Sequence, residues 1–346
     1  MALRTPQVQQ RTNILVVGGA GFLGSHLCEY LLEKHNVICV DTYASGKEQN
    51  IDHLFSNPHF EFIRHDIREP LDFKSFKGLE RFRVAHVGVQ HIYHLANTFS
   101  PTHVLSAPID IALTCVQGTK HILELALQWR SRMLFVSDAA IYGGDIPRDP
   151  VKEDFTGTIQ WRNRLWWYSQ HLRSAESLIE AYRHTYSLDT KIARLHHTYG
   201  PHMYFDDGRF IPTLVRAALQ NEEIIIDTAF QQASCLFVSD AVDGLEKIMN
   251  SEKGSVYNLG HPSSYTVDEI IEKVFSLTGS TAVVRRGSVT LDESLIQTSW
   301  RQNAHTPDMA LLRDEAGWFP IVLLDEGLKK TIDFMKSLRG IRTIAS

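Results

Sequence analysis

The sequence predicts an α/β fold, a Rossmann-type, doubly wound parallel sheet with a smaller C-terminal α/β substrate lobe. The first reason is a glycine cluster, Gly18, Gly21 and Gly24, which follows the apolar run 14–17 and opens an amphipathic helix. Glycines at this spacing allow a tight turn, close approach of a pyrophosphate and close packing of helix on strand. The second is Asp41, which ends the next strand pattern where a ribose-binding carboxylate is expected. Third, strand and helix patterns alternate, which favours a parallel sheet over a barrel.

Apolar runs of strand type recur through the first 195 residues. Strands are expected at 14–17, 37–41, 60–65, 92–96, 133–137 and 191–195. Helical patterns separate them, over 22–34, within 72–89 together with a surface excursion, over 109–127 and over 168–186. In the helix over 109–127, five residues fall near one apolar stripe: Ile109, Leu113, Val116, Leu123 and Leu127. Residues 97–108 are expected to form a loop.

Beyond Pro201 the patterns are shorter and less regular. Short strands (223–226, 255–259), short helices (212–219, 239–249, 267–277) and a terminal helix from about Leu324 are expected. We therefore divide the chain into a flexible N-terminus (1–12), an NAD-binding Rossmann-type domain (13–200) and a region (201–340) that forms mainly the substrate-binding lobe, with segments returning to the first domain.

Composition excludes several classes of function. A net charge of −5 gives no basic surface for nucleic acid. No apolar run is long enough to cross a bilayer, and the N-terminus lacks the apolar stretch of a signal peptide, so we expect a cytoplasmic protein without a membrane partner. Four cysteines without paired spacing are typical of reduced thiols. Seventeen histidines show no ligand pattern, so no metal site is expected.

Several longer motifs suggest a family. They are the glycine segment 18–27, CVDTYASGKEQNI (39–51), FEFIRHDI (60–67), IYHLA (92–96), IYGG (141–144), IARLHHTYGPHM (192–203), DDGRF (206–210), FVSDAVDGL (237–245) and GLKKTIDF (327–334). With them the chain, from about residue 13 to 335, resembles the extended short-chain dehydrogenase/reductases of the epimerase/dehydratase group. Within that group it is most similar to the UDP-glucuronate decarboxylases.

The resemblance implies NAD as the cofactor and assigns residues to it. Besides the three glycines, the implied NAD contacts are Phe22 and Leu23 on the pyrophosphate, Asp41 on the adenosine ribose, Ser45, Gly46 and Lys47 in the following loop, Asp66 and Ile67 at the adenine, and Leu95 and Ala96 at a strand end. The carboxylate of Asp41 repels a 2′-phosphate, so NAD is expected to bind better than NADP. Lys47 is a cation that could soften this preference.

The catalytic positions depart from the family. Tyr168 stands where the family's proton-abstracting tyrosine belongs, but the lysine four residues on is replaced by Leu172. Asp138 replaces a threonine, Ala140 a glutamate and Cys115 an asparagine. A phenol with a pKa of about 10 is a poor base near neutrality without a nearby cation. A neighbouring carboxylate would raise that pKa further. The sequence therefore argues against the ordinary tyrosine-based oxidation of a sugar.

Substrate positions are altered as well. Ala233, His202 and the pair His305 and Thr306 stand where the resemblance implies basic residues that bind a nucleotide diphosphate. Each lost charge-assisted hydrogen bond is worth roughly 1.5–3 kcal/mol. A UDP-sugar is therefore expected to be a poor substrate.

Several of these residues could have a purely structural role instead of a catalytic or binding one. Asp138 is an acid/base group or a turn residue at its strand end. Of His196 and His197, one titrates near neutrality and acts as acid/base, with His197 preferred, or both are structural. Leu172 is interpreted as simple packing. Trp161, Trp166 and Trp167 line an apolar substrate pocket or pack between lobes.

The leading hypothesis is an NAD-binding epimerase/dehydratase/decarboxylase-like enzyme with a divergent active site, in which Tyr168, Asp138 and His197 act on a small molecule other than a standard UDP-sugar. The alternatives are a non-catalytic NAD-binding sensor or partner protein, and an ordinary UDP-glucuronate decarboxylase. By resemblance, a homodimer is expected through the helices over about 105–128 and 169–186.

Overall fold

The computed structural model describes residues 11–97, 100–143, 150–157, 166–287, 300 and 305–344, with side chains up to 338. Residues 1–10 of the N-terminus expected to be flexible lie outside the described residues; only Arg11 and Thr12 are described. Trp161 lies outside it too.

A parallel seven-stranded sheet forms the centre of the molecule, which confirms the predicted doubly wound α/β fold. Its order is β11-β6-β5-β4-β1-β2-β3. The strands are β1 (Asn13–Val17), β2 (Asn36–Asp41), β3 (Phe60–Arg64), β4 (His91–His94), β5 (Arg132–Asp138), β6 (Thr190–Leu195) and β11 (Val256–Leu259). The order reverses between β1 and β4, and in such sheets ligands bind beyond the carboxyl ends of the strands at this point.

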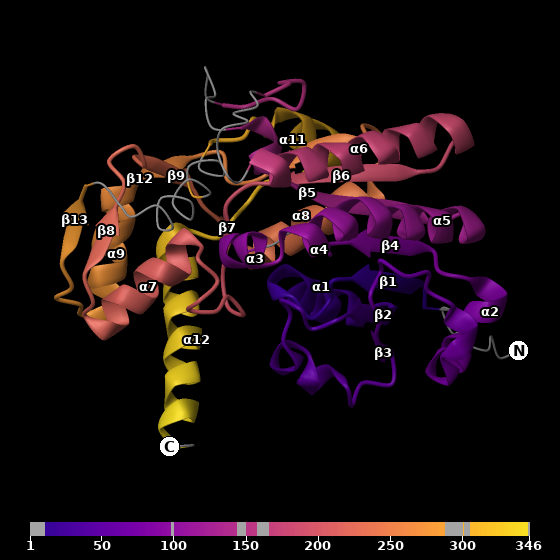
Figure 1. Cartoon of the computed structure of the whole chain (residues 1–346), viewed down its shortest axis with the longest axis horizontal. Helices are drawn as coiled ribbons and strands as arrows, with labels where there is room; N and C mark the ends of the chain where they lie inside the picture. Colours follow the sequence, from indigo (N-terminus) through magenta and orange to yellow (C-terminus); the bar gives the residue numbers. More distant parts are fainter. Residues whose placement is uncertain are drawn as a thin grey trace, which may run out of the picture.

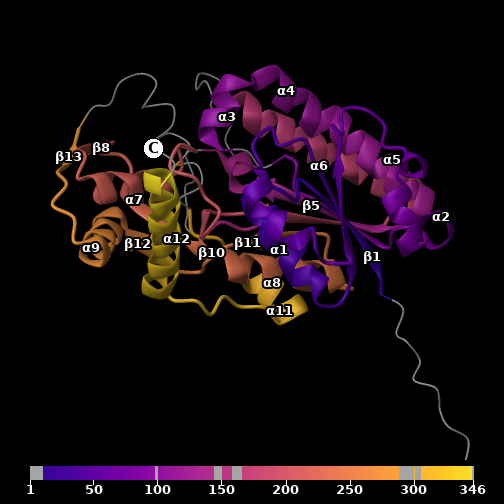
Figure 2. The same ribbon diagram turned by 90° about the horizontal axis from the view of Figure 1, so that it is seen from below.

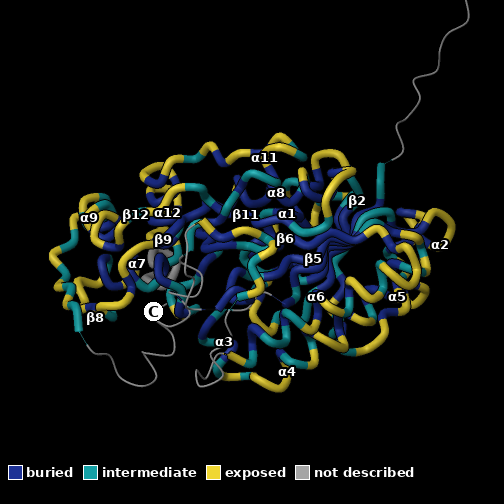
Figure 3. Tube along the Cα trace, turned by 90° about the horizontal axis from the view of Figure 1, so that it is seen from above, coloured by how far each residue is buried: buried dark blue, intermediate teal, exposed yellow. Residues whose placement is uncertain are grey.

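Helices cover both faces of the sheet because its strands are apolar on both sides. In β1, Ile14 and Val16 belong to one buried cluster, whereas Leu15 and Val17 belong to the other. The first face carries α1 (Phe22–Leu32) and α8 (Val238–Asn250), and the second carries α4 (Pro108–Leu113), α5 (Thr119–Trp129) and α6 (Trp166–Tyr186) (Figure 3). The strands between these two layers form the buried centre of the molecule.

The segment expected as a loop and one long helix is different in the structure. Helix α3 (Pro101–Ser106) lies within the expected loop, with the Ser100 side chain accepting from the His103 N–H and with a proline at its start. After α4 a π-helical segment, η5 (Thr114–Gly118), precedes α5.

The first three residues of the expected stripe are exposed, whereas Leu123 is buried and Leu127 packs against the core. Ile109, Leu113 and Val116 are 73%, 42% and 38% exposed. Ile111 and Cys115 are buried in their place. The helix carries apolar residues on two sides, and the wider turn of η5 changes the helical period on which the stripe was projected.

Short turns of 3-10 helix fill several connections. They are η1 (Glu48–Asn50), η2 (Asp52–Leu54), η3 (Phe73–Ser75), η4 (Lys77–Phe82) and η6 (Ala139–Tyr142), with the single-turn α2 (Val84–Val87) after η4. The segment over 72–89 is thus a chain of short helical turns.

The second half of the chain builds a smaller lobe beside the sheet (Figures 1 and 2). Its elements are β7 (Thr198–Tyr199), α7 (Phe210–Gln220), β8 (Ile224–Ile226), β9 (Gln232–Ser234), β10 (Leu236–Phe237), β12 (Ser264–Thr266), α9 (Val267–Thr278) and β13 (Val284–Arg286). The strands form three two-stranded pairs, β10 with β7, β12 with β9 and β13 with β8. Helix α12 (Leu324–Ile344) packs against α9.

Three elements of this second half belong with the large sheet. Strand β11 pairs with β6, α8 packs against α1, and α11 (Ala310–Ala316) packs on β11 and α8. The four cysteines are buried and carry free thiols. Across the described residues, every helix is too short or too polar to span a bilayer.

Candidate functional site

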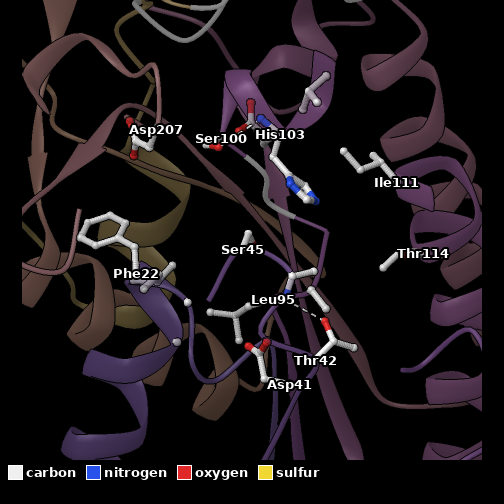
Figure 4. A pocket seen from close by; sticks show the side chains of 18 of the residues that line it. Phe22, Asp41, Thr42, Ser45, Leu95, Ser100, His103, Ile111, Thr114 and Asp207 are labelled. Atoms are coloured by element: carbon white, nitrogen blue, oxygen red, sulfur yellow. Dashed lines mark hydrogen bonds between the residues drawn. The ribbon is translucent and has the colours of Figure 1, made fainter. Parts of the chain in front are cut away.

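A deep pocket opens at the carboxyl ends of the central strands. It is lined by Val17 at the end of β1, Asp41 at the end of β2, Leu95 after β4, Asp138 at the end of β5 and Leu195 at the end of β6. Figure 4 shows side chains from the sheet, the start of α1, α3 and the smaller lobe pointing into it. The pocket therefore lies where the strand order predicts a ligand site.

The glycine loop forms one wall and permits close contact with a ligand. Gly18 has a φ of +83°, and a Cβ there would lie 2.9 Å from the backbone nitrogen of Ala96. A Cβ on Gly24 would overlap the carbonyl oxygen of Gly18. Helix α1 then begins at Phe22 without a side-chain cap on its first turn. Uncapped N–H groups at a helix start are suited to phosphate oxygens.

Asp41 is fixed by the backbone around it. Its Oδ2 accepts from the Ala20 N–H at 3.0 Å, and its Oδ1 accepts from the Tyr43 N–H at 2.8 Å. Burial raises the pKa of this carboxyl group above its usual range, against the opposing effect of these N–H donors. The side chain is held at the pocket wall, where it can accept hydrogen bonds from ribose hydroxyls.

The segment after β3, which the family resemblance assigns to the adenine, forms another part of the pocket wall. Asp66 and Ile67 line the pocket, together with Arg68, which the sequence analysis missed. Arg68 donates to Asp66 through Nε at 2.9 Å and forms an ion pair with Asp110 on α4. The Arg68 guanidinium holds the pKa of Asp66 below its usual range.

The other assigned cofactor residues divide into two groups. Phe22, Leu23, Gly21, Ser45, Leu95 and Ala96 line the pocket. Gly46 and Lys47 lie beside it, because Gly46 is pressed against Ala20 and the Lys47 ammonium lies over the ring of Tyr204. A glycine cradle, an uncapped helix start and a strand-end carboxylate in one pocket fit a dinucleotide.

The three residues expected to be catalytic, Tyr168, Asp138 and His197, also line the pocket. Tyr168 is buried, and its hydroxyl donates to the carbonyl oxygen of Asn97 at 3.2 Å. The Oδ1 of Asp138 accepts from the Ala140 N–H at 2.7 Å and caps η6. The turn-residue interpretation of Asp138 thus has a structural basis, and its place in the pocket leaves the acid/base interpretation open.

Leu172 follows Tyr168 by one helical turn and is completely buried. It belongs to the same apolar cluster as Ala175 and Ile179, which supports the packing interpretation. No lysine lines the pocket among the residues the structure describes.

The two neighbouring histidines have different surroundings. His196 is hydrogen-bonded through Nδ1 to the carbonyl oxygen of His305 at 3.0 Å, which is a structural role. His197 is buried, and its Nε2 has no hydrogen-bond partner in the structure. Burial lowers the pKa of each to about 4, so the expectation that one titrates near neutrality is wrong.

The next residues stand at positions where the family resemblance implies basic, phosphate-binding side chains. Here they are uncharged or already hydrogen-bonded within the protein. Ala233 is buried in β9. His202 bonds Ser25 Oγ through Nδ1 at 2.8 Å and stacks on His26, and burial lowers its pKa to about 4. A cation does line this side of the pocket, since Arg209 lies there with its Nε 3.7 Å from Asp207.

The tryptophan pocket is a further correction. Trp166 is 38% exposed, and Trp167, which also belongs to α6, packs on the core; neither residue lines the pocket. Trp300 lines it instead, and its indole N–H donates to the carbonyl oxygen of Gly208 at 2.7 Å. No sequence signal marked Trp300. The serine–proline pair at 100–101, a helix-start pattern, could have revealed α3 and the pocket residue His103.

A Rossmann-type sheet with a glycine cradle and a strand-end carboxylate defines a dinucleotide-binding protein. Residues 14–260 match the NAD dependent epimerase/dehydratase family. The chain belongs to this family, and NAD is its cofactor.

Known relatives agree with this assignment. The chain is 34% identical over 323 residues to UDP-glucuronic acid decarboxylase 6 of Arabidopsis thaliana, covering 92% of this chain and 88% of the relative. It is 32% identical over 330 residues to UDP-glucuronic acid decarboxylase 1 of Xenopus tropicalis, covering 95% and 73%.

Two solved structures share the fold. UDP-glucose 4-epimerase of Thermotoga maritima has a TM-score of 0.79 at 24% identity, covering 95% of this chain and 100% of its own. UDP-glucuronic acid 4-epimerase of Bacillus cereus, solved with NAD, has a TM-score of 0.77 at 23% identity, covering 94% and 99%.

Proposed function

We propose that the protein is an NAD-dependent enzyme of the epimerase/dehydratase type that acts on a small molecule other than a standard UDP-sugar. The observation that carries this proposal is Leu172, which is completely buried where the family resemblance implies the lysine that activates Tyr168. A tyrosine without that cation is a poor base at neutral pH. A different group must then move the proton.

The proposed acid/base set is Tyr168, Asp138 and His197, all of which line the pocket. NAD, when bound, supplies a hydride acceptor that can later return the hydride. Asp138 is the group of this set best suited to accept a substrate proton, because carboxylates are ionised near neutrality. His197, with its pKa at about 4, is neutral there and can orient a substrate hydroxyl through Nε2.

The proposed substrate lacks the diphosphate of a UDP-sugar. His202 is kept uncharged by burial, Ala233 has no polar side chain, and Arg209 already faces Asp207. These residues offer little charge to a group that carries two negative phosphates.

The test is incubation of the full chain with NAD and UDP-glucuronate, followed by analysis for UDP-xylose and carbon dioxide. We expect no useful turnover by the wild type or by Leu172→Lys, because Asp138, Ala140 and Cys115 remain unlike the family. Calorimetry with NAD serves as the control that the protein is folded. Robust product from the wild type would show instead an ordinary decarboxylase, as the names of its relatives suggest.

A second candidate is a non-catalytic NAD-binding sensor or partner protein. It is favoured by the hydrogen bonds that engage two of the three residues of the proposed set, from Tyr168 to the carbonyl oxygen of Asn97 and from the Ala140 N–H to Asp138. Once a substrate of the wild type is found, Tyr168→Phe and Asp138→Asn should each reduce its turnover at least about a hundredfold. Tight NAD binding without turnover of any small molecule tested would favour the sensor.

We also propose a homodimer. Ile109, Leu113 and Val116 form an exposed apolar surface on α4 and η5, the helix that the family resemblance places in the interface. Light scattering at micromolar concentration should give twice the chain mass, and Leu113→Glu should give one chain mass. A monomeric wild type would remove this proposal.

The cytoplasmic location stays a prediction.

A further inference from the structure

A lysine lies beside the ribose-binding carboxylate. The backbone N–H of Lys47 donates to the carbonyl oxygen of Ala20 at 3.1 Å. The N–H of Ala20 in turn donates to Asp41 Oδ2 at 3.0 Å. Both residues are therefore attached to one position of the glycine loop. A flexible lysine side chain this close to the adenosine ribose is a ready partner for a 2′-phosphate.

The lysine side chain points to another group. Its Nζ lies 3.2 Å from the centroid of the Tyr204 ring, a close cation–π contact. Tyr204 lines the pocket, whereas Lys47 does not. The acidic residue Asp207, three positions beyond Tyr204, adds an attractive charge on the same side.

The tyrosine ring is itself held in place. Its hydroxyl donates to Asn50 Oδ1 at 2.7 Å, and the Asn50 side-chain amide donates to the Ala20 carbonyl oxygen at 2.9 Å. Asn50 is buried, and its N–H donates to the Lys47 carbonyl oxygen at 3.1 Å. The ring, the lysine and the glycine loop thus form one closed set of contacts.

We infer that Tyr204 is a specificity-determining residue for the cofactor, because it holds the Lys47 ammonium on its ring and withholds that charge from a 2′-phosphate. Asp41 rejects NADP by repulsion, and Tyr204 removes the cation that would offset this repulsion. The inference concerns cofactor choice and holds whichever reaction the protein performs.

The test is calorimetric titration of the full chain with NAD and with NADP, for the wild type, Tyr204→Leu, Tyr204→Phe, Lys47→Met and the double variant. Tyr204→Leu keeps an apolar side chain but removes the ring face, so the NADP-to-NAD ratio of Kd values should fall about tenfold. Tyr204→Phe keeps the ring and should change the ratio less than about threefold. The double variant of Tyr204→Leu with Lys47→Met should have a ratio of Kd values near that of the wild type, because the cation that would bind the 2′-phosphate is absent.

Three results would overturn the inference. The first is an unchanged ratio of Kd values in Tyr204→Leu, and the second is an equal gain in the double variant. The third is a selective loss of NADP binding in Lys47→Met, which would show that the lysine already reaches the phosphate. We expect Lys47→Met to leave the ratio near that of the wild type, because the charge is already withheld. The Lys47→Met variant decides the question even if Tyr204→Leu does not fold.

Discussion

Replacing His197 by leucine should make the protein more resistant to acid. His197 is 7% exposed, and its Nε2 has no hydrogen-bond partner among the described residues. It lies near the Phe210 ring and the charge of Arg209. Burial and that positive charge both disfavour the imidazolium, and together they lower the pKa to about 4. In the unfolded chain the same group has a pKa of about 6.5.

The sign follows from proton binding. Between pH 6.5 and 4 the unfolded chain binds more protons at His197 than the folded chain, so the free energy of unfolding rises with pH in this window. The contribution is complete above the unfolded pKa and falls as the pH drops toward the folded one. With pKa values of about 4 and 6.5, lowering the pH from about 7.5 to 5 costs the wild type about 2 kcal/mol through this residue.

The measurement is urea unfolding of the wild type and His197→Leu at the two pH values, followed by tryptophan fluorescence. The difference in unfolding free energy should shift by about 2 kcal/mol in favour of the variant at the lower pH. His94, His196 and His202 also have lowered pKa values, but they are present in both proteins and cancel. A difference that does not change with pH would refute the argument that His197 is buried in its neutral form.

Three further substitutions test the site and its support. Gly24→Ala should abolish NAD binding in calorimetry and cost about 1–3 kcal/mol of stability, because its Cβ would overlap the backbone of Gly18; normal NAD affinity would contradict the cradle. Asp41→Ala should weaken NAD binding about tenfold or more and narrow its advantage over NADP, as titration of both cofactors would reveal. Glu176→Gln should cost about 3–5 kcal/mol in urea unfolding, because it removes the negative charge that lies 2.8 Å from the Arg194 guanidinium in a mostly buried pair; a loss below about 1 kcal/mol would show a solvated pair.

That the glycine loop and Asp41 line one pocket could be predicted because the requirements of these residues are local. Gly18 needs a positive φ and Gly24 a contact without Cβ, and both needs are written in a short stretch between a strand and a helix. Asp41 is equally local, since it ends a strand next to that loop. The parallel sheet followed from the same regular alternation.

The rest depends on contacts between distant parts of the chain. The Lys47 side chain lies over the ring of Tyr204, which is far from it in the sequence. Trp300 lines the pocket although it follows the strands and helices of the smaller lobe in the sequence. The neighbours His196 and His197 could not be told apart, because which of them meets a partner depends on His305. Such pairings leave no periodic pattern in the sequence.

The last strand of the large sheet in chain order, β11, is synthesised more than 50 residues after its partner β6. Strand β6 pairs with β11, and α8, which follows residue 200 in the chain, covers one sheet face together with α1. A fragment ending at residue 200 would expose the edge of β6 and an apolar sheet face, which are features that promote aggregation. On the ribosome, the sheet cannot be completed until Leu259 has emerged. We therefore expect that residues 13–200 do not fold as a separate unit and that the nucleotide-binding part should be expressed only as the whole chain.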